Sequence, residues 1–142
     1  MCVFCDIVAG DVPAHVVFED EVSVAFLDLR PLFEGHTLLV PRLHVETLTD
    51  LPDELLAPYF SAARLLSRAM EEVVGAQGSF VAMNNKISQS VPHLHAHVVP
   101  RRRKDGLRGF FWPRSKYVSE ERMAEVAATL RAGISELRDK AP

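Results

Sequence analysis

Three histidines, His93, His95 and His97, alternate with apolar residues within residues 89–99. They make up half of the six histidines of the chain. Successive side chains of an extended strand point to opposite faces, so the three imidazoles would line one face at a spacing of about 7 Å. Imidazole can act as a nucleophile, a proton carrier or a metal ligand near neutral pH. The pattern therefore predicts a strand with one face for chemistry and the other face for the core.

A second group of chemically versatile residues is the Cys-x-x-Cys pair formed by Cys2 and Cys5. A redox-active pair normally follows a strand, and the sequence leaves no room for one before Cys2. A structural zinc site takes four nitrogen or sulfur ligands, and His44 and His93 are available as the other two. The alternative is a pair of free thiols and a surface histidine at position 44.

Length and composition favour one soluble domain over residues 1–142, in which residues 101–142 form a C-terminal basic loop and a helix. The 142 residues are 48% apolar and 25% charged, with a net charge of −3. They contain neither a long apolar run nor a leader-like segment, so we expect a cytoplasmic protein that does not enter the membrane.

Positive charge is concentrated in residues 101–116, where seven basic side chains accompany the single acidic Asp105. A phosphate-bearing ligand would suit such a segment, and a solvated basic loop is the alternative. A nucleic-acid-binding domain would usually be basic as a whole, so no nucleic-acid partner is expected.

The elements that must position these residues follow from periodicity and turn signals. Residues 15–19 and 22–28 are predicted to form a hairpin, and residues 36–40 a central strand that ends at Pro41. Apolar residues that include Leu56, Phe60 and Val73 recur every three or four positions and predict a helix over residues 53–74. Two more strands are predicted at 79–84 and 94–99, and a last helix at Ser119. This order indicates an α+β fold with a five-stranded, mostly antiparallel sheet and two main helices.

Taken together, these segments resemble the histidine triad (HIT) superfamily of nucleotide hydrolases and transferases. The similarity runs from Cys2 to about Arg103. It rests on the alternating triad with Gln-Ser-Val just upstream, on Gly-His-Thr-Leu-Leu-Val-Pro at 35–41, and on Phe-Leu-Asp at 26–28, which occur in the order typical of the family.

The resemblance implies that His95 attacks the α-phosphorus of a nucleotide, and that water then hydrolyses the nucleotidyl-histidine intermediate. A backbone carbonyl near the first histidine would hold the other nitrogen of His95. His97 and His36 would contact phosphate oxygens, and Ser90 and Gln89 would hydrogen-bond the phosphate or the leaving group.

The resemblance also implies a nucleotide site. Asp28 matches a carboxylate that accepts the ribose hydroxyls, although an aspartate at a strand end often only starts a turn. Four apolar residues would form a slot for the base, although taken alone they are more typical of core packing: Val3, Phe4, Ile7 and Leu29. Asn84 is the remaining residue predicted to bind the nucleotide.

For the metal, the resemblance supports zinc on Cys2, Cys5, His44 and His93, with iron as an open alternative. His93 would then brace the strand that presents His95. One departure from the family is the short connection 85–88, which lacks glycine. This leaves the leaving-group contacts open, and Lys86 is a candidate to supply charge there. Residues 109–113, which include Trp112, would either close over the substrate or simply pack.

The leading hypothesis is a HIT-type hydrolase or nucleotidyl transferase. Its substrates would be purine nucleotides, namely AMP or GMP esters, phosphoramidates (as in a phosphoramidase) or diadenosine and other dinucleoside polyphosphates. The alternatives are a non-catalytic purine-nucleotide-binding module and a metallohydrolase whose zinc is held by the three triad histidines. The latter fits poorly, because three same-face residues span about 13 Å. Relatives usually form homodimers, so we expect one here.

Overall fold

The computed structural model describes residues 1–107 and 114–140. Residues 1–105 form one compact unit and the remaining residues a second, and each is treated by itself here. The prediction of one domain over residues 1–142 stays a prediction. The segment 109–113 with Trp112 lies outside the described residues. In the part of the chain that is described, no helix is long and apolar enough to cross a membrane.

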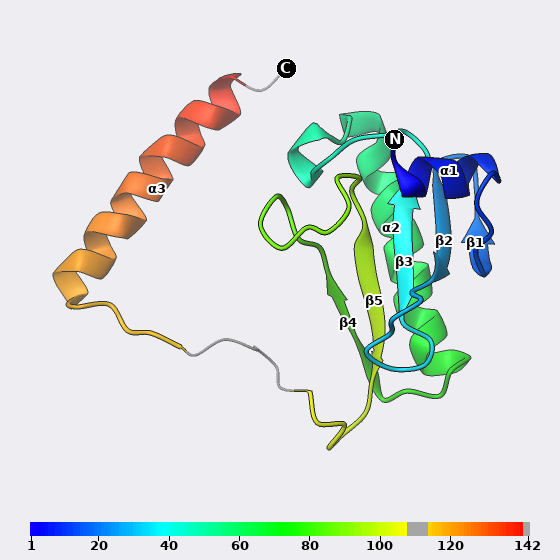
Figure 1. Ribbon diagram of the computed structural model, residues 1–142. Coiled ribbons are helices and arrows are strands. Elements are labelled where there is room, and N and C mark those ends of the chain that lie inside the picture. The colour runs from blue at the N-terminus through cyan, green and yellow to red at the C-terminus, as the bar shows by residue number, and fades with distance from the viewer. Residues whose placement is uncertain (108–113, 141–142) are drawn as a thin grey trace. The chain divides into compact units, whose positions relative to one another are not determined.

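The first unit is built on five strands in the order β1-β2-β3-β5-β4, all antiparallel (Figure 1). The strands are β1 Val16–Glu19, β2 Ser23–Leu27, β3 Thr37–Pro41, β4 Gly78–Ala82 and β5 Ala96–Arg101. All five residues of β3 are buried, which agrees with its prediction as a central strand ending at Pro41. The predicted α+β fold is confirmed, and the sheet is wholly antiparallel among the described strands.

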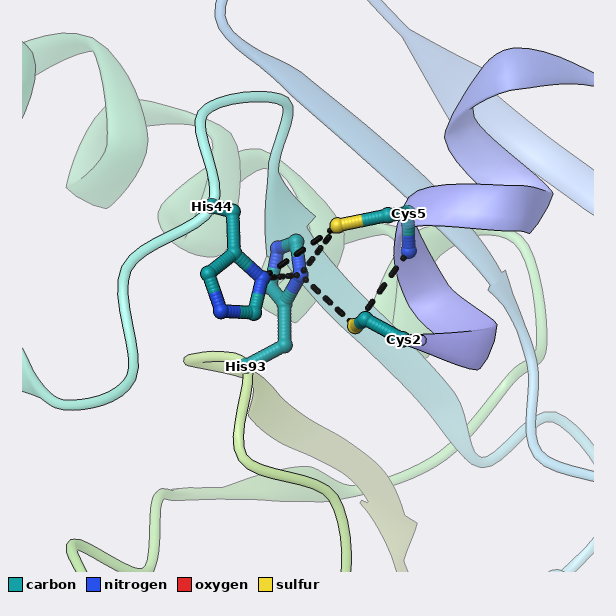
Figure 2. Close-up of side chains that lie close together, drawn as sticks. All are labelled: Cys2, Cys5, His44 and His93. Carbon is teal, nitrogen blue, oxygen red and sulfur yellow. Dashed lines mark hydrogen bonds between the residues drawn. The ribbon is translucent and has the colours of Figure 1, made fainter.

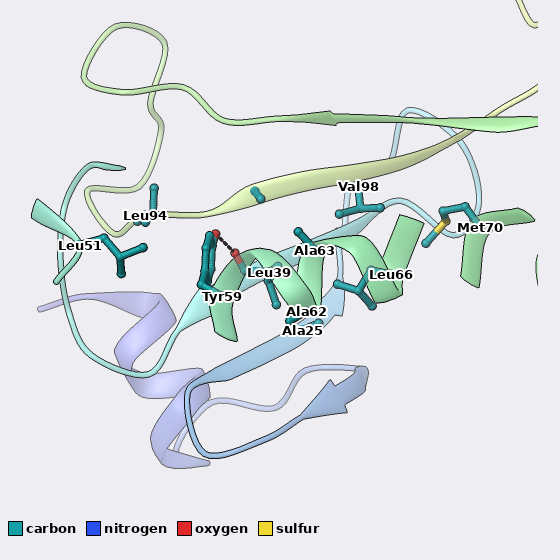
Figure 3. Close-up of a cluster of buried hydrophobic side chains, with 11 residues drawn as sticks. Ala25, Leu39, Leu51, Tyr59, Ala62, Ala63, Leu66, Met70, Leu94 and Val98 are labelled. Carbon is teal, nitrogen blue, oxygen red and sulfur yellow. Dashed lines mark hydrogen bonds between the residues drawn. The ribbon is translucent and has the colours of Figure 1, made fainter. Parts of the chain in front are cut away.

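One face of the sheet is covered by α2, which spans Asp53–Glu72 (Figure 1). Buried side chains of α2 pack on Ala25, Leu39 and Val98 of the sheet (Figure 3). The fully buried Tyr59 donates its hydroxyl to the Leu39 carbonyl at 2.8 Å. Burial raises the pKa of Tyr59, so the phenol stays protonated and remains a donor.

The predicted apolar face of this helix needs a correction. Leu56, Phe60 and Val73 fit the three-and-four spacing, but they are 37%, 42% and 81% exposed. Tyr59 occupies the buried position beside Phe60, because its ring fills the core while its hydroxyl reaches a strand carbonyl. Apolar spacing alone could not decide between the two neighbouring aromatic residues.

The opposite face of the sheet is covered by a short helix that was not predicted, α1 Val3–Ala9. Its Phe4 is buried against Val24, Phe26, Leu38 and Val40, the residues that alternate with those facing α2. The Sγ atom of Cys2 caps α1 by accepting the Cys5 N–H at 3.5 Å, and Gly10 ends it in a left-handed conformation. The sheet therefore has an α2 face and an α1 face.

In the second unit, α3 spans Glu120–Lys140. Ser119 caps it, as predicted, by accepting the Arg122 N–H at 3.0 Å. Along α3, Leu130, Ile134 and Leu137 are exposed.

Candidate active site and metal centre

The first cluster of functional side chains combines Cys2, which caps α1, and Cys5 of α1 with two histidines. These are His44, from the loop after β3, and His93, from the segment before β5 (Figure 2). Cys2 Sγ lies 3.4 Å from His93 Nδ1. Cys5 Sγ lies 3.2 Å from His44 Nδ1 and 3.5 Å from His93 Nδ1, and the two imidazole nitrogens are 3.2 Å apart. The four ligand atoms thus converge on one point.

These distances fit a tetrahedral metal ion. With metal–sulfur bonds of about 2.3 Å and metal–nitrogen bonds of about 2.0 Å, the edges of the tetrahedron are about 3.3 to 3.8 Å. The protonation of His93 fits as well. Its Nε2 lies 2.8 Å from the Pro41 carbonyl, which can only accept, so the proton is on Nε2 and the lone pair of Nδ1 faces the cysteines. The four residues could therefore hold a metal ion.

His95 lies two residues further on, with its ring on the α1 face beside Phe4. The two ring centroids are 5.1 Å apart, and His95 is 4% exposed. Its Nδ1 lies 2.8 Å from the carbonyl oxygen of His93. Because that oxygen can only accept a hydrogen bond, the proton of neutral His95 is on Nδ1, and Nε2 keeps a lone pair. Such a nitrogen is a nucleophile.

A third group joins His97 to His36 and Asp28 across three strands. Leu38 pairs with His97 in the sheet, and the Asp28 N–H donates to the His36 carbonyl at 2.9 Å, so the three side chains meet on the α1 face. His36 Nε2 lies 2.9 Å from His97 Nδ1 and 3.6 Å from Asp28 Oδ2. The other nitrogen of His36, Nδ1, accepts the Leu32 N–H at 3.0 Å.

Both histidines of this group are neutral at pH 7. Burial, with the nearby His95 and His36, lowers the pKa of His97 to about 4, although Asp28 acts in the opposite direction. Burial likewise lowers the pKa of His36, and Asp28 opposes it. Neutral imidazoles donate from one nitrogen and accept at the other, so this group is a hydrogen-bonded chain.

The triad histidines do not share one ion. Their rings take part in three separate contacts: His93 with the cysteines, His95 with a carbonyl and His97 with His36. Neither group of potential metal ligands in the described residues contains all three.

The strand prediction also needs a correction, because β5 begins only at Ala96. The Leu94 N–H donates to the Val45 carbonyl, a loop contact, so alternation extends beyond the regular strand.

Next to His95 and His97 lies a cavity of about 300 Å³. Its lining includes five residues predicted for the nucleotide site together with Ser90: Val3, Phe4, Ile7, Asp28 and Leu29. The sequence did not reveal several further lining residues, Val12, Pro13, Ala14, Phe26, Leu38 and Val91. One signal could have predicted α1, namely the spacing of Phe4, Ile7 and Val8 before Gly10. The pattern is short and overlaps the cysteine motif, which was interpreted only as a metal site.

Three of the predicted catalytic and nucleotide-binding residues lie outside the described lining of the cavity: His36, Asn84 and Gln89. Both ends of the Gln89 side chain bind backbone: Oε1 accepts the Lys86 N–H at 2.8 Å, and Nε2 donates to the Glu46 carbonyl at 2.6 Å. Gln89 therefore ties the glycine-free connection to the loop after His44. Lys86 adopts a positive φ of 72° in that connection.

Residues 101–105, the part of the basic segment that belongs to the first unit, do not line the cavity either. Arg101 ends β5, four residues from His97 and thus about 13 Å along the strand. Its guanidinium binds the Asp105 carboxylate at 2.6 Å. The Asp105 N–H donates to the Arg102 carbonyl at 3.2 Å, so residues 102–105 form a turn at the other end of the strand.

Several known proteins are similar to this chain in sequence. The chain is similar to "Protein hit" of Bacillus subtilis, with 41% identity over 113 residues and 78% of each chain covered. It is 34% identical to adenosine 5'-monophosphoramidase hnt1 of Schizosaccharomyces pombe, over 84% of this chain and 89% of that one. It is 35% identical to adenylylsulfatase HINT3 of Arabidopsis thaliana, over 75% of this chain and 55% of that one.

Solved structures agree. A HIT family protein from Bacillus subtilis matches with a TM-score of 0.82 at 35% identity, covering 92% of this chain and 95% of that one. A zinc-bound histidine triad family protein from Mycobacterium smegmatis matches with a TM-score of 0.71 at 38% identity, covering 99% and 97%. The HIT domain profile matches residues 9–104, and the chain therefore belongs to the histidine triad (HIT) family.

Proposed function

We propose that the protein is a nucleotide hydrolase that works through a nucleotidyl-histidine intermediate on His95. The observation that carries the proposal is the 2.8 Å contact between His95 Nδ1 and the His93 carbonyl. This contact leaves the lone pair of Nε2 available on a residue that lines the cavity. Family membership and the names of two relatives, an adenosine 5'-monophosphoramidase and an adenylylsulfatase, support a nucleotide substrate.

The cavity suits the nucleoside part of such a substrate. Apolar side chains of α1 and β2 offer a slot for a flat base, and Asp28, whose Oδ2 lies 3.6 Å from His36 Nε2, lines the same cavity. The Oδ1 atom of Asp28 accepts the Arg30 N–H at 2.9 Å, which fixes the carboxylate. Carboxylate oxygens have lone pairs left for the two ribose hydroxyls. We infer that the group transferred to His95 is a purine nucleoside monophosphate, with AMP as the leading candidate.

In the first step, His95 Nε2 forms a bond to the α-phosphorus, and the bond from phosphorus to the leaving group breaks. The leaving group departs with its electron pair and takes up a proton. In the second step, water attacks the same phosphorus, the nitrogen–phosphorus bond breaks, and a nucleoside monophosphate leaves. His97 and Ser90, which line the cavity, are the proposed contacts of the phosphate oxygens. Gln89 is proposed to contribute by holding the connection 85–88 in place.

At the cysteine site we propose zinc. Two thiolates and two imidazoles are a typical structural zinc set, and a zinc-bound relative supports the choice. The ion would supply four bonds that fix α1 and His93 and no part of the reaction chemistry. Metal analysis of purified protein is expected to give one zinc per chain, whereas a stoichiometric content of iron instead would refute the identity.

The test of the proposed function compares two histidine variants. His95→Ala should lower release of AMP from adenosine 5'-phosphoramidate, adenylyl sulfate and diadenosine polyphosphates at least about a thousandfold, because the nucleophile is gone. His15→Ala, at an exposed histidine outside the cavity lining, is the matched control and should keep full activity. Undiminished turnover by His95→Ala would refute the assignment. Tight AMP binding by the wild type without turnover of any substrate would indicate a binding module.

A further inference from the structure

His36 is placed differently from a residue that contacts phosphate. It is 3% exposed and does not belong to the described lining of the cavity. Both of its ring nitrogens have protein partners, Leu32 N–H at 3.0 Å on Nδ1 and His97 Nδ1 at 2.9 Å on Nε2. His36 thus connects the backbone of the loop between β2 and β3 to a histidine of the cavity.

The direction of these hydrogen bonds is fixed by the backbone. An amide N–H can only donate, so His36 Nδ1 must hold a lone pair, and the proton of neutral His36 is on Nε2. The Nε2–H then donates to His97 Nδ1, so the proton of neutral His97 is on its own Nε2. The lowered pKa values of both side chains agree with neutral rings. Asp28 Oδ2, 3.6 Å away, further favours a proton on His36 Nε2.

We propose that His36 is a positioning residue for His97. Because its Nδ1 accepts the Leu32 N–H, His36 keeps its proton on Nε2 and donates it to His97 Nδ1, so that His97 presents an N–H, and not a lone pair, to the cavity. His95 and His97 are neighbours, with ring centroids 5.1 Å apart, yet the backbone gives their Nε2 atoms opposite roles. His95 offers the nucleophilic lone pair and His97 a hydrogen-bond donor for the phosphate. The catalytic meaning of this arrangement rests on the proposed function, whereas the proton positions do not.

The same series of hydrogen bonds argues against a second metal ion beside His36 and His97. Asp28, His36 and His97 lie close enough to share an ion. A metal on His36 Nε2 would require loss of the proton there, because Nδ1 already accepts the Leu32 N–H. That would leave an imidazolate in a buried position. A hydrogen-bonded pair satisfies both rings without this cost.

The test is imidazole 15N NMR on the full-length, metal-loaded protein, in which protonated and unprotonated ring nitrogens are well separated. Wild-type His97 is expected to have its proton on Nε2. His36→Leu removes the donor at a similar volume and should give His97 a mixture of both tautomers and lower kcat about tenfold. His36→Gln, whose amide can donate to His97 Nδ1, should restore the Nε2 proton and most of the lost kcat.

The proposal is overturned if wild-type His97 has its proton on Nδ1, if His36→Leu leaves the tautomer unchanged, or if a second equivalent of zinc shifts the His36 and His97 signals. If His36→Leu fails to fold, Leu32→Pro removes the N–H and Leu32→Ala retains it, so only the former should mix the tautomers. An intact tautomer in a protein that turns over no nucleotide would refute the proposed function and leave this inference standing.

Discussion

Single backbone groups decide what each histidine of the triad can do. The Pro41 carbonyl accepts from His93 Nε2, so the lone pair on Nδ1 faces the cysteines. The His93 carbonyl accepts from His95 Nδ1, so the lone pair of His95 is on Nε2. The Leu32 N–H sets the proton of His36, and through it the proton of His97. Three chemically identical side chains thereby obtain three different roles. Exchanging one histidine should therefore have consequences that depend on its position.

The first prediction concerns His93 and His95. His93→Ala removes a fully buried ring, a bond to Pro41 and a metal ligand, so it should lower the free energy of unfolding by about 3 kcal/mol and release the metal. His95→Asn, whose amide can still donate to the His93 carbonyl, should abolish turnover and cost less than about 1 kcal/mol. Chemical denaturation measures both; equal losses of stability would contradict the division of roles.

The second prediction is the pH dependence of stability. The pKa of His97 is about 4 in the folded protein and close to its ordinary 6.5 in the unfolded chain. Between these values the unfolded state binds a proton that the native state does not, so the free energy of unfolding should fall as pH is lowered from 7 towards 4. His97→Asn cannot titrate there and should show a flatter dependence by urea denaturation at pH 7 and pH 5. Parallel curves for variant and wild type would refute it.

At the scale of elements, α1 links the candidate metal site to the proposed nucleotide site. Cys2 and Cys5 of this segment face the ligand cluster, whereas Val3, Phe4 and Ile7 line the cavity. The buried Phe4 ring contacts both His93 and His95, with centroids 6.0 and 5.1 Å away. A helix of seven residues has little stability of its own, so its position depends on these contacts and, in the proposed zinc-bound protein, on the metal.

The third prediction follows from this link. Removing the metal with a chelator, or replacing Cys5 by Ser, should loosen α1 and weaken AMP binding by about tenfold. By linkage, AMP should raise the affinity for the metal by the same factor. Ala9→Ser, at an exposed position of α1 outside both sites, is the control and should leave both affinities unchanged. Calorimetric titration of AMP into metal-free and metal-loaded protein decides; equal affinities would contradict the link.

How much the sequence could predict also differs among the elements. Strands and the two long helices follow from periodicity, and Gly35 and Pro41 mark the limits of β3. The helix α1 was missed because its capping residue is a cysteine and its pattern is short. The tautomers could not be predicted, because they depend on backbone groups such as the Leu32 N–H that any residue would supply. The choice of Tyr59 over Phe60 for the core depends on one carbonyl of β3.

For the whole molecule, exposed apolar side chains and the outer position of β4 in the sheet bear on assembly. β4 is an outer strand of the sheet, with Val81 44% exposed, and Leu56 and Phe60 of α2 are also exposed. The fourth prediction is a homodimer formed through α2 and β4. Light scattering on the full chain should give twice the mass of 15.8 kDa, and Phe60→Glu should shift it towards monomer. A wild-type monomer at micromolar concentration would refute it.

The central claim is that His95 Nε2 forms a covalent bond to the substrate phosphorus. The most direct measurement quenches wild-type protein in base within milliseconds of mixing with adenosine 5'-phosphoramidate, because nitrogen–phosphorus bonds of histidine survive base, and then locates the adenylyl group by peptide mass spectrometry. We expect the adenylyl mass on His95, and none in His95→Asn. An adduct on His93 or His97 instead, or rapid turnover with no adduct at any time point, would contradict the account.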